Sequence, residues 1–153
     1  MMLIASEVIA RLAGKTLVTA ESLTGGGIGA ALTAVPGASA VYKGGVISYT
    51  DAVKSGVLGV PEAYLSSFGA VSAPVAEAMA LGALQLMQAD VAVSVTGLAG
   101  PAGDEFGNPV GTVFIGYCSK ITGFSREYHF SGNRESIRNQ TIEAALQLIL
   151  DNL

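Results

Sequence analysis

The chain has 153 residues and a mass of 15.4 kDa, the size of one ordinary domain, so we expect residues 1–153 to form a single domain and exclude a second folded one. Half of the residues are apolar and 13% are charged, which argues against disorder. No stretch of about 18 strongly apolar residues is free of Gly, Pro, Ser, Thr or charge, which argues against a membrane span. Eight basic and twelve acidic residues give a net charge of -4, so we expect a small-molecule partner rather than nucleic acid or a membrane.

Apolar residues at helical spacing predict a helix from Leu3 to Leu12 that ends near Gly14. A short β-rich strand over Lys15–Ala20 then leads through a Ser- and Gly-rich loop into a helix over Ile28–Val35. The elements expected after it, in chain order, are a strand Val41–Tyr49, short helices Asp51–Leu58 and Pro61–Phe68, a long helix from Ser72 as N-cap to about Gln88, a strand Asp90–Val95, an antiparallel hairpin of Val110–Ser119 and Thr122–Phe130, and a helix Asn133–Leu153.

Strands alternate with helices before the hairpin, and this order predicts an α/β fold, a three-layer α/β/α sandwich around a mixed sheet. The irregular stretch Gly97–Pro109 is long for a connector and is typical of a functional loop. Cys118 is the only cysteine, which excludes an internal disulfide and a Cys-based zinc cluster. The N-terminus lacks the charged region and cleavage site of a secretory signal, so we expect a cytoplasmic protein.

Open α/β sheets bind ligands beyond the carboxyl ends of their strands. The segment Glu21–Gly27 places two hydroxyls and three glycines before a helix, and unpaired N–H groups there favour an anion such as a phosphate. The alternative interpretation is an ordinary strand-to-helix turn in which Ser22 or Thr24 caps the helix.

Lys54 is one of four lysines and has apolar neighbours in the sequence, so a partly desolvated amine could serve there as a base. Ser22 and Ser39 are both candidate nucleophiles for this amine, and Tyr49 could relay a proton between the two groups. The competing interpretation is that Lys54 is a solvated charge on a helix and Tyr49 a strand aromatic with a wet hydroxyl.

Arg134 and Arg138 lie four residues apart near the start of the last helix, where they form either a phosphate or carboxylate clamp or a solvated face. The single histidine, His129, lies in a strand without a neighbouring acid or nucleophile, and a structural role is favoured. No His or Cys pair has metal-ligand spacing, so we expect no metal, and the glycines do not match a dinucleotide fingerprint.

Several segments together resemble the CinA C-terminal domain family over about residues 5–150. They are Ala20–Gly26, Pro36–Ala40, Gly45–Tyr49 with Lys54, Leu58–Val60, Gly69–Ser72, Val95–Pro101, Pro109–Val113 and Phe130–Arg134 with Arg138. The order of these segments and the spacing between them both resemble the family's pattern along nearly the whole chain.

This resemblance implies an amidohydrolase that converts nicotinamide mononucleotide to nicotinate mononucleotide and ammonia, in pyridine-nucleotide recycling, without metal or cofactor. It implies that a serine and a lysine, assisted by a tyrosine, carry out the hydrolysis. These roles carry over to Ser39 or Ser22, with Ser39 preferred as nucleophile, and to Lys54 and Tyr49. The substrate-binding residues that the resemblance implies are Thr24, Gly25, Gly26, Gly37, Thr96, Arg134 and Arg138, and which arginine meets the phosphate stays open.

Two further expectations concern partners. The same pocket could instead serve a non-catalytic nucleotide-binding accessory protein, whereas a competence- or damage-related role in binding nucleic acid conflicts with a sequence pI of 4.8. A mean hydropathy of +0.52 and few charges predict that apolar surface is covered in a homodimer or larger homo-oligomer.

Overall fold

The structure is a computed structural model that describes all 153 residues. Its elements in chain order are α1 (Met2–Arg11), β1 (Leu17–Glu21), α2 (Gly27–Thr33), a 3₁₀ turn η1 (Ala38–Ala40), β2 (Tyr42–Ile47), α3 (Asp51–Gly56), α4 (Glu62–Phe68), α5 (Ala73–Met87), β3 (Val91–Gly97), β4 (Thr112–Ser119), β5 (Gly123–His129) and α6 (Arg134–Asp151). The expected order of elements is confirmed, and most boundaries agree to within a few residues.

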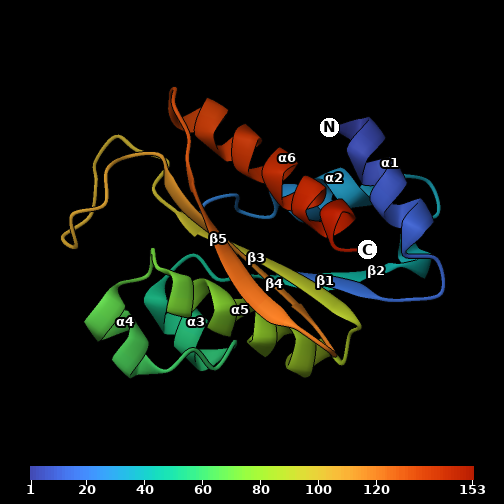
Figure 1. Ribbon diagram of the computed structural model, residues 1–153, viewed down its shortest axis with the longest axis horizontal. Helices are drawn as coiled ribbons and strands as arrows, with labels where there is room; N and C mark the ends of the chain where they lie inside the picture. Colours follow the sequence, from blue (N-terminus) through green and yellow to red (C-terminus); the bar gives the residue numbers. More distant parts are fainter.

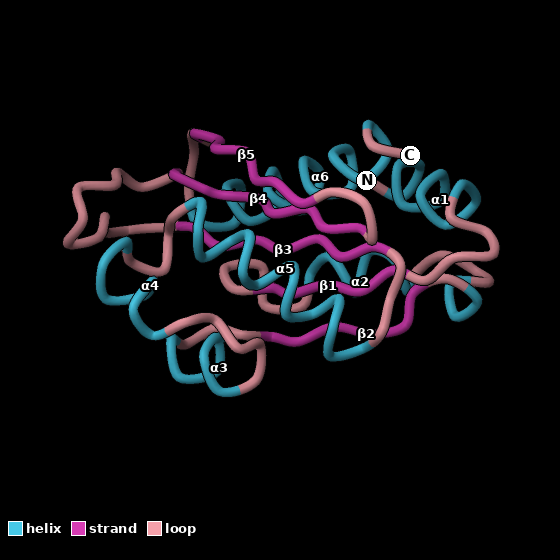
Figure 2. Tube along the Cα trace, turned by 60° about the horizontal axis from the view of Figure 1, so that its bottom comes forward, coloured by secondary structure: helices cyan, strands magenta, loops and turns pink.

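The five strands form one mixed sheet in the order β2-β1-β3-β4-β5. Strands β2, β1 and β3 are parallel to one another, while β4 runs antiparallel to both β3 and β5. Helices α1, α2 and α6 cover one face, and α3, α4 and α5 cover the other (Figures 1 and 2). The predicted three-layer sandwich around a mixed sheet is therefore confirmed.

The position of each strand in the sheet follows its residue pattern. Strands β1 and β3, in the centre, are buried along nearly their whole length, as expected where helices cover both faces. Strand β2 lies at one edge and alternates between half-buried and exposed residues. Gly45 in β2 is required by packing, because a Cβ there would lie 2.2 Å from the Thr19 hydroxyl oxygen of β1.

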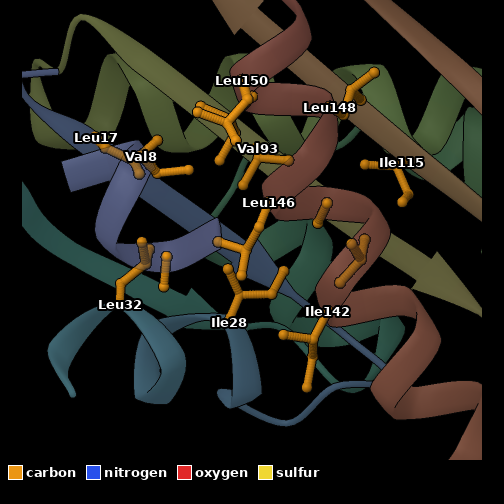
Figure 3. Close-up of a cluster of buried hydrophobic side chains, with 14 of the residues drawn as sticks. Val8, Leu17, Ile28, Leu32, Val93, Ile115, Ile142, Leu146, Leu148 and Leu150 are labelled. Carbon is orange, nitrogen blue, oxygen red and sulfur yellow. The ribbon is translucent and has the colours of Figure 1, made fainter. Parts of the chain in front are cut away.

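The larger part of the core lies between the sheet and helices α1, α2 and α6 (Figure 3). Side chains such as Val8, Ile28 and Leu146 are fully buried there, and each contributes about 1.5–3 kcal/mol by leaving water. A second cluster, which includes Met79 of α5, packs against the opposite face of the sheet. None of the helices combines the length with the apolar content that a membrane-spanning helix requires.

Two local details differ from the sequence-based expectations. Ser72 occupies the N-cap position of α5, but its hydroxyl donates to the Gly69 carbonyl at 2.8 Å instead of capping the helix. The turn η1, absent from the expected elements, connects α2 to β2 at the amino-terminal end of that strand. Asn133 does cap α6, because its side chain accepts the N–H of Ser136.

The carboxyl ends of β1, β2 and β3 lie at the same edge of the sheet. Glu21 at the end of β1 is paired with Ile47 of β2 and with Val95 of β3. The residues that follow these three strands therefore meet at one edge, the usual ligand-binding edge of an open parallel sheet.

Candidate functional site

A serine and a lysine contact each other at this edge. Ser22 follows β1 directly, and Lys54 lies on α3, which begins four residues after the end of β2. The Lys54 Nζ lies 3.0 Å from the Ser22 Oγ. Lys54 is 1% exposed and Ser22 is 7% exposed, so the pair is removed from bulk water. This contact agrees with the expectation of a desolvated amine beside a hydroxyl.

The other partners of the Lys54 amine are backbone carbonyls. Nζ donates to the carbonyl oxygen of Ser48 at 2.8 Å and to that of Tyr49 at 3.4 Å. Lys54 forms no ion pair with a carboxylate. Burial is the main influence on the amine and lowers the pKa of Lys54, whereas the charge of Asp51 opposes this by raising it. The environment therefore favours the neutral amine more than water does.

Tyr49 and Arg134 come together at the mouth of the site. The Arg134 Nη2 donates to the Tyr49 hydroxyl at 3.2 Å, and its Nη1 donates to the carbonyl of Gly100 at 2.5 Å. Tyr49 is 58% exposed, and its hydroxyl has no hydrogen bond to Ser22 or Lys54. The contact between Ser22 and Lys54 is direct, so the expected relay through the Tyr49 hydroxyl is not needed to connect them.

These side chains line a cavity of about 300 Å³, near the lower end of the size range of small-molecule sites. The lining residues are Ser22, Leu23, Tyr49, Asp51, Lys54, Ala70, Val71, Thr96, Gly97, Leu98, Ala99, Gly100, Ala102 and Arg134. Thr96 is buried at the end of β3, and its hydroxyl donates to the carbonyl of Ala70 at 2.8 Å. The long loop after β3 thus supplies one wall, as its length and glycine content indicated.

Arg138 holds the loop that follows Ser22. Its Nε donates to the carbonyl of Leu23 at 2.9 Å and its Nη2 to that of Thr24 at 3.3 Å. Gly25 and Gly26 next to them both have left-handed backbone angles, with φ of +60° and +101°, which a residue with a Cβ adopts only with strain. Of the two arginines, Arg134 lines the cavity and Arg138 supports this loop.

The start of α2 does not offer its N–H groups to a ligand, because a side chain of the protein already accepts them. The Glu21 carboxylate accepts the N–H of Ile28 at 2.8 Å and that of Gly29 at 3.0 Å. It also accepts the Thr24 hydroxyl at 2.7 Å. The anion that the glycine loop was expected to attract is thus internal, and sequence reasoning missed Glu21. A lone acidic residue at the end of an otherwise apolar strand was the available signal.

Ser39 and Gly37 lie away from these groups. Both precede β2, whose first residue, Tyr42, pairs with Leu17 at the start of β1. The six residues of β2 therefore separate Ser39 from the carboxyl edge by roughly 20 Å, at about 3.3 Å per residue. Ser39 is exposed and has no contact with Lys54. The preference for Ser39 as the partner of Lys54 does not agree with this arrangement, and Ser22 takes that position.

A larger cavity, of about 600 Å³, lies between α5 and the β4–β5 turn. Its ionisable side chains are Glu77, Tyr64, Tyr117 and Cys118. Burial raises the pKa of the Cys118 thiol and of the Tyr117 hydroxyl, which keeps both protonated. No hydroxyl or thiol that lines this cavity is hydrogen-bonded to a side-chain base, so we assign the candidate site to the smaller one.

Comparison with known proteins gives consistent results. The family model described as "CinA C-terminal domain" matches residues 3–153. A CinA-like protein of Synechococcus sp. is 60% identical over 114 residues, which is 73% of this chain and 27% of that protein. A nicotinamide-nucleotide amidohydrolase, PncC, of Pseudomonas putida is 47% identical over 132 residues, which is 86% of this chain and 82% of that protein.

Solved structures agree with the fold in detail. A crystal structure of a competence-damaged protein (CinA) superfamily protein from Escherichia coli has a TM-score of 0.96 at 36% identity, covering 98% of this chain and 88% of that one. The competence/damage inducible protein CihA of Agrobacterium tumefaciens has a TM-score of 0.95 at 38% identity, covering 98% of this chain and 93% of that one.

This chain spans about a third or less of several curated CinA-like relatives, between 27% and 35% of their lengths. The family model nevertheless covers nearly all of it. From its sequence and its fold, the chain belongs to the CinA C-terminal domain family.

Proposed function

We propose that this chain is an amidohydrolase that converts nicotinamide mononucleotide to nicotinate mononucleotide and ammonia, with Ser22 as nucleophile and Lys54 as base. The observation that carries the proposal is the buried contact of 3.0 Å between the Lys54 amine and the Ser22 hydroxyl. The 47% identical relative named nicotinamide-nucleotide amidohydrolase supports the substrate.

The partners of Lys54 suit a base that works in its neutral form. A neutral amine has two N–H groups and one lone pair. The carbonyls of Ser48 and Tyr49 accept two hydrogens from Nζ, which leaves the lone pair for the third direction, toward the Ser22 hydroxyl. Because burial lowers the pKa of Lys54, the neutral form becomes more accessible near neutral pH, where a general base is most effective.

The reaction then follows the pattern of other serine acyl transfers. The Ser22 Oγ attacks the carboxamide carbon and its proton passes to Lys54. The C–N bond of the tetrahedral intermediate breaks, and the departing nitrogen takes that proton and leaves as ammonia. Water, deprotonated by the same amine, attacks the acyl carbon and releases the carboxylate product and Ser22.

Backbone N–H groups after Ser22 are available to stabilise the oxyanion of this intermediate. The N–H groups of Leu23 and Thr24 donate to no acceptor within the chain. In a trans peptide the C=O and the next N–H point in opposite directions. The Leu23 carbonyl accepts the Arg138 Nε of α6, so the Thr24 N–H points away from Arg138. One such donor is worth about 100- to 1000-fold in rate.

Arg134 is the side chain that we propose for the substrate phosphate. It lines the cavity, and guanidinium groups suit phosphate because they donate two parallel hydrogen bonds. Tyr49, beside it, offers an exposed aromatic face and a hydroxyl that could help to pass a proton to the leaving nitrogen. Thr96 borders the same cavity and is proposed to contact the substrate.

The test is ammonia release from nicotinamide mononucleotide by the wild type and by Ser22→Ala and Ser39→Ala variants. Ser22→Ala is expected to abolish turnover. Ser39→Ala is the matched control, because it removes the same hydroxyl at the opposite edge of the sheet, and it is expected to keep the wild-type rate. Loss of turnover in Ser39→Ala with retention in Ser22→Ala would overturn the assignment of the nucleophile.

Calorimetry beside the ammonia assay separates catalysis from binding alone. Micromolar binding of the nucleotide by calorimetry, with no ammonia after long incubation of the wild type, would replace this proposal with a nucleotide-binding accessory role.

A further inference from the structure

We propose that Glu21 is a positioning residue whose buried carboxylate holds Ser22 against Lys54, an inference that rests on the function proposed above. Glu21 is 2% exposed and does not touch the cavity. Its part in the reaction is therefore to act through its neighbour in the chain, Ser22.

The carboxylate connects both sides of the loop that carries Ser22. Its Oε1 accepts the Thr24 hydroxyl at 2.7 Å and the Ile28 N–H at 2.8 Å. Its Oε2 accepts the Gly29 N–H at 3.0 Å and the Thr19 hydroxyl at 3.3 Å. The end of β1, the loop and the start of α2 are thus tied to one side chain, and Ser22 lies between the tied points.

The backbone of Glu21 reaches the other half of the pair. Its carbonyl accepts the N–H of Ser48 at 2.8 Å, and the Ser48 carbonyl in turn accepts the Lys54 amine at 2.8 Å. The Glu21 side chain therefore holds the loop that carries Ser22. The Glu21 backbone holds Ser48, whose carbonyl accepts the Lys54 amine. A shift of this residue changes the distance between Ser22 and Lys54.

Only an ionised carboxylate provides this set of acceptors. Glu21 forms no ion pair, and its charge is balanced by the N–H groups at the start of α2, where a negative charge is favourable. A glutamine would replace one oxygen with an NH₂ group, which would face the N–H of either Ile28 or Gly29. Hydroxyl groups can rotate to accept, whereas a backbone N–H cannot, so glutamine leaves at least one of these contacts repulsive.

Glu21→Gln is therefore expected to displace Ser22 while the hydrophobic core stays in place. Displacement of a reacting group by about 1 Å costs about 100-fold in rate. We expect kcat to fall about 100-fold, with KM changed by less than about threefold, because Tyr49, Thr96 and Arg134, the cavity residues proposed to contact the substrate, are not part of the displaced loop.

Asp90→Asn is the matched control. The Asp90 carboxylate also accepts a backbone N–H, that of Thr16 at 2.8 Å, and pairs with Lys120 at 2.9 Å. It lies at the opposite edge of the sheet, before the first residue of β3. A purely structural effect of removing a hydrogen-bonded carboxylate would appear in both variants, whereas a positioning effect lowers kcat only in Glu21→Gln.

The experiment has a second readout that does not depend on the substrate. A fluorophosphonate forms a bond between phosphorus and the Ser22 Oγ and releases fluoride, and intact mass follows the rate of this labelling. Glu21→Gln is expected to slow labelling by the same factor as kcat, with circular dichroism unchanged. Should Glu21→Gln fail to fold, Thr24→Val removes one donor to Oε1 and is expected to slow labelling roughly threefold to tenfold.

The outcomes distinguish this inference from the proposed function. A wild type that is labelled at Ser22 but releases no ammonia contradicts the proposed substrate, and labelling then still tests Glu21. A folded Glu21→Gln variant, or Thr24→Val in its place, that reacts at the wild-type rate overturns the positioning role. A wild type that neither turns over nor becomes labelled overturns both proposals.

Discussion

Replacing Lys54 with methionine removes the amine of the proposed base and keeps most of the side-chain volume. A general base contributes about 100- to 10,000-fold to a rate. Because Nζ contacts Ser22 directly at 3.0 Å and no other base touches that hydroxyl, we expect kcat for ammonia release to fall by this factor.

The same variant tests whether the amine is desolvated in the folded protein. Burial lowers the pKa of Lys54 from its ordinary value of 10.5. Between the folded and unfolded pKa values the unfolded chain binds more protons, so the stability of the wild type rises with pH in this window by up to about 1.4 kcal/mol per pH unit. Below the folded pKa the cost of burying the ammonium is present in full.

Methionine does not titrate, so Lys54→Met lacks this rise. It also leaves the carbonyls of Ser48 and Tyr49 without their donor, a cost of about 1–3 kcal/mol each that does not depend on pH. The free energy of unfolding of the variant minus that of the wild type is therefore most positive at low pH and decreases as pH approaches 10.5.

Ammonia release and urea unfolding across a pH series measure both effects. Lys43→Met is the matched control, because Lys43 also donates to a backbone carbonyl, that of Met87 at 2.6 Å, but is exposed. It should change neither kcat nor the pH dependence of stability. A Lys54→Met enzyme with the wild-type kcat, or a stability difference from the wild type that does not change with pH, would refute the reasoning.

Three further predictions concern charge, packing and assembly. Asp51→Asn removes the charge that raises the pKa of Lys54, so the acidic limb of the kcat/KM profile should move to lower pH; an unchanged or raised limb contradicts the neutral-base mechanism. Gly82→Ala would place a Cβ 1.9 Å from the Leu58 carbonyl oxygen and should cost about 1–3 kcal/mol, whereas Gly56→Ala, with open space around its Cβ, should leave the melting temperature unchanged or raise it. Light scattering at micromolar concentration should find a dimer or a larger homo-oligomer, and a monomer alone would contradict this expectation.

The fold could be predicted from the sequence because its signals are local. Apolar residues at helical spacing predicted α1, and the apolar run that became β3 predicted a strand. The antiparallel hairpin of β4 and β5 followed from two β-rich runs on either side of a short turn. The order of the strands has no such local signal, because it depends on which strands pair.

The candidate site was predictable only in part for the same reason. Lys54 was distinctive in the sequence because a charged residue among apolar neighbours is uncommon, but its partner depended on topology. Ser22 and Ser39 are both serines near glycines, and only the parallel pairing of β1 with β2 puts one at the carboxyl edge and the other at the amino edge. Glu21 was overlooked because the two backbone N–H groups and two hydroxyls that donate to its carboxylate come together only after folding.

The acceptors that surround the Lys54 amine, apart from Ser22, are main-chain oxygens of Ser48 and Tyr49. Every amino acid carries the same carbonyl, so mutational drift at positions 48 and 49 can change the neighbouring side chains without altering the polar contacts of the amine. Replacing the Tyr49 side chain, which lines the cavity, therefore changes what the substrate meets while the carbonyl contacts of the lysine are retained.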